Sequence, residues 1–250
     1  MKRCCQFIFA AVLILGWAQT AAAAGRLVKD MVALDRIYIA ALSLTGEENK
    51  LVAKKIIKQL ETQWLTFKKC HLSDFREDRS AKVDFAEINQ MIEDAARVTR
   101  LNGRLSEVHE ILEGVRIIFL HLRNRNSIDY YLDYLTRFHI SMETIMLIVK
   151  SKNTETLTGD NILAVKIQSS KAMQAWKEAT KADFDRALFL FTLDRETKRK
   201  EYMENMTESL GRLRQALESD DRVAIVSAAL SAQANFDKLY ALFGDGDKIN

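Results

Sequence analysis

The sequence predicts an all-α protein of tandem antiparallel (up-and-down) helical bundles, with about eight helices after a signal peptide. The chain of 250 residues contains no proline and only nine glycines, so it lacks the residues that most often interrupt helices. Leucine, alanine, lysine and glutamate are abundant, a composition typical of long helices. Apolar residues also recur every three or four positions, which gives each helix one apolar face.

The N-terminus has the three parts of a signal peptide. Lys2 and Arg3 supply positive charge, residues 7–17 form an apolar segment, and residues 21–24 give an A-x-A cleavage site. The apolar segment is shorter than the ~20 residues that cross a bilayer as a helix. We therefore expect residues 1–24 to be removed and the protein to be periplasmic or secreted.

Charge and cysteine content restrict the partners of the mature chain. Removal of 24 residues, Lys2 and Arg3 among them, leaves 226 residues with 35 basic and 34 acidic side chains. Such a balanced surface gives no reason to expect a nucleic acid as partner, and no later segment is apolar enough to predict membrane insertion. Cys70 is the only cysteine left after cleavage, so a contact with a protein partner or a homodimer is more plausible than an internal disulfide.

Four helices are predicted in the first half of the mature chain. Between the first two, Thr45-Gly-Glu-Glu48 is a capping box, with Thr45 as the N-cap of the second helix. Asn102-Gly103 ends the third helix. The apolar faces of these helices span residues 27–42, 57–67, 85–98 and 105–122.

The second half repeats this arrangement. Its predicted helices begin with an apolar face over 128–145 and continue at about 161–182, 184–217 and 221–243. The segment from Leu34 to Ile39 resembles the segment from Leu135 to Ile140, and each precedes a helix with one tryptophan. We predict two related units, 25–125 and 126–250, packed separately or as one body; coincidence between amphipathic helices is the alternative.

Two predicted helices carry polar residues on their apolar faces. On the helix of 105–122, His109 and Arg116 lie within or at the edge of the apolar arc, with Glu113 at its border. On the helix of 128–145, His139 lies on the apolar face and Glu143 at its margin. If the turn between them is centred near residue 125, the histidines lie about 24 and 20 Å along antiparallel helices, close enough to share one site.

Histidine and glutamate together suit a divalent transition metal such as zinc, iron or copper. Asp35 and Tyr38, on the first helix, could add oxygen atoms. Arg116 opposes a metal ion and favours an anionic small ligand instead. The predicted metal ligands are His109, Glu113, His139, Glu143 and Asp35, and the predicted contacts to a cofactor or small ligand are Arg116 and Tyr38.

A structural interpretation of the same residues predicts a different geometry. Buried histidines are often satisfied by a neighbouring carboxylate, and Glu113 and Arg116 could form a structural ion pair. The chain would then be a non-catalytic structural or protein-interaction module. A binding site requires the side chains within about 5 Å of a common point, whereas the structural network requires separate intramolecular bonds.

Residues 26–124 resemble the exported four-helix cytochromes of the b562 and c′ type in their layout. A leader precedes four amphipathic helices, with Met31 early in the first and His121 late in the fourth. The resemblance implies Met31 and His121 as axial ligands of a noncovalent haem. The covalent haem motif C-x-x-C-H is missing, and His121 lies opposite the apolar arc, so a bare metal ion is preferred over haem.

The sequence predicts a protein that is not an enzyme. It contains no G-x-S-x-G nucleophile motif, no phosphate-binding glycine loop and no H-E-x-x-H metalloprotease motif.

Overall fold

The computed structural model describes residues 5–46, 50–151 and 156–246, with side chains from Gly25 onward. Every regular element in these ranges is helical, which confirms the all-α prediction. The elements are α1 (Cys5–Gly46), α2 (Lys50–His71), the 3₁₀ helix η1 (Leu72–Phe75), α3 (Ala81–Arg100), α4 (Leu105–Arg125), α5 (Tyr131–Ser151), α6 (Gly159–Lys181), α7 (Leu193–Glu218) and α8 (Arg222–Ala241).

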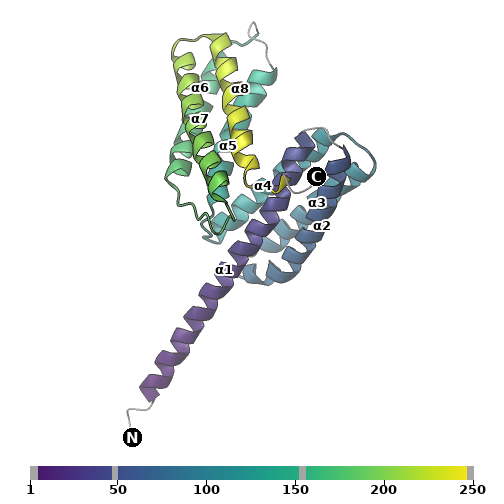
Figure 1. The fold of residues 1–250 in the computed structure, drawn as a ribbon, viewed down its shortest axis with the longest axis vertical. Helices are drawn as coiled ribbons and strands as arrows, with labels where there is room; N and C mark the ends of the chain where they lie inside the picture. Colours follow the sequence, from purple (N-terminus) through teal and green to yellow (C-terminus); the bar gives the residue numbers. More distant parts are fainter. Residues whose placement is uncertain (1–4, 47–49, 152–155, 247–250) are drawn as a thin grey trace.

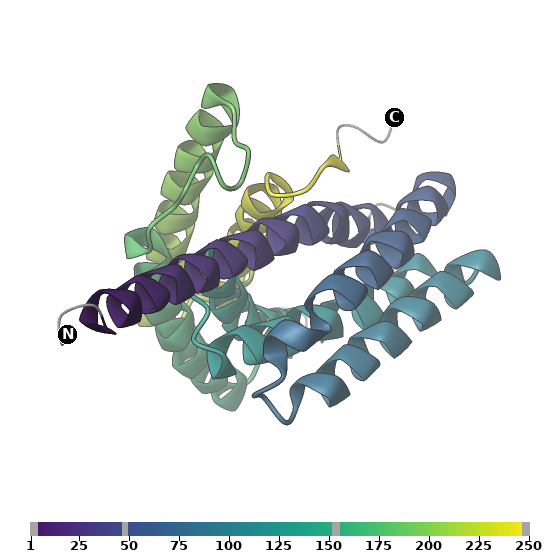
Figure 2. The ribbon, with the colours of Figure 1, turned by 90° about the horizontal axis from the view of Figure 1, so that it is seen from below.

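The helices form two antiparallel bundles that diverge from a common junction (Figure 1). In the first unit, α1 to α4, each helix packs on the next and α1 also packs on α4; α5 to α8 repeat the pattern. The units meet where α1 packs on α8 and α4 on α5. Figure 2 shows α1 running between the second unit and helices α2 and α3.

Each bundle has an aromatic core around one tryptophan. In the first unit the Trp64 ring lies 5.3 Å from that of Phe85, and its indole N–H donates to Asn89 at 3.3 Å. In the second unit the Trp176 ring lies 5.3 Å from that of Phe138, and its N–H donates to Thr207 at 3.0 Å. Each indole therefore buries its apolar body and still satisfies its polar group.

The turn between α1 and α2 differs from the predicted capping box. Thr45 lies in the last turn of α1, where its hydroxyl donates to the carbonyl groups of Ala41 and Leu42 at 3.0 and 2.8 Å. It therefore cannot be the N-cap of α2, which begins at Lys50. The prediction failed because a threonine hydroxyl can also donate to carbonyl groups of the preceding turn of its own helix, instead of accepting a backbone N–H of the helix that follows. Glu48 lies outside the described residues.

The seventh helix begins at Leu193, nine residues later than predicted. Thr192 caps it by accepting the backbone N–H of Arg195 at 3.2 Å. The preceding segment turns at Leu190, whose φ of 56° is incompatible with a helix. The apolar residues of this segment pack against the end of the second bundle; they are Phe184, Phe189 and Phe191, in contact with Phe243.

The predicted signal peptide falls mostly within α1, which continues from Cys5 past the expected cleavage point to Gly46. Residues 1–4 of the predicted signal peptide lie outside the described residues. Within the described part of the chain, no helix has both the length and the apolar character needed to cross a bilayer.

A candidate functional site at the junction of the two units

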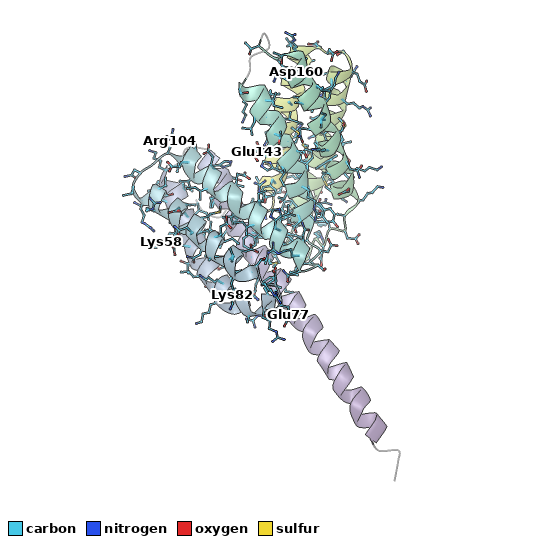
Figure 3. All side chains as sticks on the ribbon, turned by 180° about the vertical axis from the view of Figure 1, so that it is seen from behind. Lys58, Glu77, Lys82, Arg104, Glu143 and Asp160 are labelled. Atoms are coloured by element: carbon cyan, nitrogen blue, oxygen red, sulfur yellow. The ribbon has the colours of Figure 1, made fainter. Side chains whose placement is uncertain are left out.

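The predicted His and Glu residues come together where the two units meet. Helix α4 of the first unit carries His109, Glu113 and Arg116 at steps of four and three, so they lie above one another on one face. Helix α5 of the second unit carries His139 and Glu143 one turn apart. Figure 3 shows Glu143 on the side of the second unit that is turned toward the first.

Glu113 is the centre of this cluster. Its Oε2 lies 3.3 Å from Nε2 of His139, and its Oε1 lies 3.6 Å from Nε2 of His109. Oε1 also accepts a hydrogen bond from Nη2 of Arg116 at 3.0 Å. The Glu143 carboxylate lies 3.8 Å from Nε2 of His139 and is half exposed. Four of the five predicted metal ligands are thus neighbours, and Arg116 joins them.

The two imidazole rings are held in different ways. Nδ1 of His109 lies 3.0 Å from the carbonyl oxygen of Leu42, which can only accept, so this nitrogen carries a proton. In the neutral ring, Nε2 of His109 then presents a lone pair to Glu113. The His139 ring stacks on Phe236 at 5.2 Å, and its buried Nδ1 has no hydrogen-bond partner among the described atoms.

Glu113 remains ionised far below neutral pH. Burial by itself raises the pKa of this carboxyl, but the hydrogen bond from His139 and the charge of Arg116 outweigh it and lower the pKa to about 2. The carboxylate is therefore available at neutral pH to compensate the buried guanidinium.

Arg116 brings a permanent positive charge into the cluster. Its side chain is 3% exposed, and the guanidinium lies 4.4 Å from the ring centre of Tyr240. Burial opposes the charge, but Tyr240 and Glu113 more than compensate and raise the pKa of Arg116. Its Nε and Nη1 atoms are buried without a hydrogen-bond partner among the described atoms. A second cation bound at Glu113 would have to compete with this guanidinium.

Asp35 and Tyr38 are not brought to the histidines. Asp35 accepts a hydrogen bond from the Tyr130 hydroxyl at 2.7 Å, and burial raises the pKa of its carboxyl. The Tyr38 hydroxyl donates to the carbonyl of Leu112 at 2.7 Å. Tyr38 instead lies beside Arg116, the other predicted contact to a small ligand, whose charge acts on its hydroxyl. Asp35 contacts the segment that leads into α5.

The donor set does not form a ready metal site. Among the described residues, no group of three or more His, Cys, Asp and Glu side chains is arranged so that it could hold a metal ion. The geometry gives a reason, because the two histidines approach different oxygens of Glu113 and one of these oxygens already accepts from Arg116.

A second part of the junction was missed by the sequence analysis. Arg123 of α4 forms a buried bidentate pair with Asp133 of α5, with distances from 2.6 to 3.0 Å. Arg36 of α1 pairs with Asp245 and donates to the carbonyl of Phe189 at 3.0 Å. No local pattern in the sequence connects Arg36 with Asp245, because the two residues are 209 positions apart.

His71 was also missed as a structural residue. Its Nδ1 lies 2.7 Å from Asp74 and its Nε2 lies 2.7 Å from Asp30, so one buried ring links α1, α2 and η1. His121 is exposed, whereas Met31 is buried in the first unit.

Comparison with protein-family models, curated proteins and solved structures finds no match to this chain.

Proposed function

We propose that this chain is an exported, non-catalytic interaction module whose two helical bundles are held in a fixed relation by the polar junction. The observation that carries the proposal is that the polar residues at the junction bind one another. Glu113 accepts from Arg116 and contacts His139 across the two units, so the residues expected to bind a ligand are engaged with one another.

The energetics of buried charge support this role. Removing one partner of a buried pair leaves an uncompensated charge and costs about 3–5 kcal/mol, although the intact pair adds little net stability. Such pairs favour one arrangement over others. The Arg123–Asp133 pair also joins α4 to α5, so more than one charge pair would be broken if the units separated. A fixed relation between the bundles presents their outer faces to a partner as one surface.

Unfolding followed separately in each unit tests the coupling. In the mature chain, which contains only Trp64 and Trp176, Trp176→Phe leaves Trp64 as the reporter of the first unit, and Trp64→Phe leaves Trp176 as the reporter of the second. The proposal predicts coincident urea transitions by fluorescence, because the junction couples the two cores. Two transitions with separate midpoints would contradict it.

Metal binding is the second candidate function, and one observation favours it. His109 donates through Nδ1 to a backbone carbonyl, the arrangement that orients many metal-binding histidines. Zinc, iron or copper would fit this donor set if Arg116 released Glu113.

Elemental analysis of the purified protein separates the two candidates. The structural proposal predicts no bound metal and no thermal stabilisation by added zinc. Near-stoichiometric metal in the wild type, lost in a His109→Ala/His139→Ala variant, would establish the metal site and overturn the structural interpretation of this cluster.

A further inference from the structure

A groove lies at the end of the first unit, where α2 leads through η1 into α3. Its volume is 790 Å³, and its lining residues all fall between Leu65 and Lys82. Figure 3 shows Lys82 and Glu77 at the end of this unit from which the N-terminal part of α1 projects. The groove contains none of the residues of the junction, so it is a separate feature.

The floor of the groove is apolar. Leu65, Leu72, Phe75 and Ala81 contribute to its lining. Phe75 and Ala81 are buried and hold the floor in place, whereas the Leu65 side chain is 57% exposed. An exposed leucine and a buried phenylalanine in the same groove offer a surface on which a hydrocarbon chain gains free energy by leaving water.

Basic side chains surround this floor. Lys68, Lys69, Arg76, Arg79 and Lys82 all line the groove. Arg76 pairs with exposed Glu77 outside the lining, and Lys68 donates to Asn89 at 3.3 Å. Within the described part of the chain, Lys69, Arg79 and Lys82 form no ion pair, and all three are exposed. Their positive field is therefore directed to solvent and to the groove.

The acidic residue in the lining does not neutralise this field. Asp78 accepts hydrogen bonds from the backbone N–H of Ser80 at 2.9 Å and from the side chains of Asn126 and Arg125 at 2.9 and 3.1 Å. These three donors already compensate its carboxylate. The groove consequently combines an apolar floor with unpaired cations at its edge.

We propose that this groove binds a single-chain anionic amphiphile, such as a medium- or long-chain carboxylate. The carboxylate head would contact Lys69, Arg79 and Lys82, and the chain would cover Leu65 and Leu72. The volume lies in the range of about 300–1,000 Å³ found for small-molecule sites. The lining comes from one short stretch of chain, much less than the roughly 20–30 residues per side of a standard protein interface. This inference does not depend on the proposed role of the junction.

Isothermal titration calorimetry of the full chain with sodium decanoate tests the proposal, with decyl maltoside and acetate as comparison ligands. Decanoate and decyl maltoside are used below their critical micelle concentrations. We expect saturable binding of decanoate, and no saturable binding of the neutral amphiphile or the short anion. A Lys69→Glu/Arg79→Glu/Lys82→Glu variant should bind decanoate roughly tenfold or more weakly, and Leu65→Ser should also weaken it.

A charge-matched variant on another surface controls for non-specific attraction. Lys171→Glu/Lys177→Glu/Lys181→Glu changes three exposed lysines of α6 and should leave decanoate binding unchanged. Circular dichroism verifies that both triple variants are folded. Absence of decanoate binding, equal binding of decyl maltoside, or equal losses in the two triple variants would each overturn the proposal.

Discussion

Replacement of Glu113 by glutamine removes one charge from the centre of the junction and keeps the shape of the side chain. The pKa of this carboxyl falls from 4.5 to about 2 in the folded protein. At 1.36 kcal/mol per pKa unit, this shift corresponds to about 3 kcal/mol. The side chain is only 16% exposed, so solvent screens the interaction little. We expect Glu113→Gln to lower the free energy of unfolding by about 3 kcal/mol at pH 7, within the range for breaking a buried pair.

The same shift predicts a dependence on pH. Because the folded pKa lies below the unfolded value, the stability due to Glu113 is fully present above pH 4.5 and is lost as the pH falls toward 2. The difference between wild type and Glu113→Gln should therefore shrink steadily below pH 4.5. Urea unfolding at pH 7, 5, 4 and 3, followed by circular dichroism, measures this difference.

Two further variants make the measurement specific. Glu110→Gln alters an exposed glutamate on the same helix and should change stability by less than about 0.5 kcal/mol. Arg116→Met added to Glu113→Gln should recover much of the loss, because it removes the uncompensated cation. A loss below 1 kcal/mol for Glu113→Gln at pH 7, or a loss that is unchanged at pH 3, would refute the reasoning.

The other predictions concern the termini and the first bundle. His71→Ala should lower the free energy of unfolding by about 2 kcal/mol in urea titrations, because it removes both carboxylate contacts of a buried ring; an unchanged midpoint would contradict that role. Gly244→Val should destabilise the protein by about 2 kcal/mol, because an added Cβ would lie 2.9 Å from the backbone nitrogen of Ala40, whereas Gly246→Val meets no atom within 4 Å and should be neutral. N-terminal sequencing of the exported protein should begin at Gly25, and recovery of the intact leader would exclude cleavage after Ala24.

Much of the fold is predictable because helix formation depends on local pattern. The three-to-four residue period and the absence of proline specify helices wherever one face can be buried. The segment 184–192 shows the limit of this reasoning. It contains no glycine or proline that would predict an interruption, but contacts with Phe243 and the turn at Leu190 decide the conformation. Such contacts depend on residues distant in the sequence.

The candidate site was likewise predictable only where it depends on local helix geometry. Helical spacing placed His109 and Glu113 on one face, and the level of the turn placed His139 beside them, because both arguments use local geometry. The pairing of Arg36 with Asp245 and that of His71 with Asp30 could not be found in this way, since these partners lie 209 and 41 residues away. The proximity of polar residues was therefore predictable, whereas the pairs they form required the tertiary structure.

The coupling of the two units across α4 and α5 is the central claim, and a double-mutant cycle on Glu113 and His139 tests it most directly. Urea unfolding of the wild type, Glu113→Gln, His139→Gln and the double variant at pH 7 isolates the interaction between the two side chains from the effects of each substitution. The account predicts a favourable coupling energy of about 1 kcal/mol or more, because the residues lie 3.3 Å apart in a largely buried junction. Additive losses would show that Glu113 and His139 act independently, and would contradict a polar junction that holds the two bundles together.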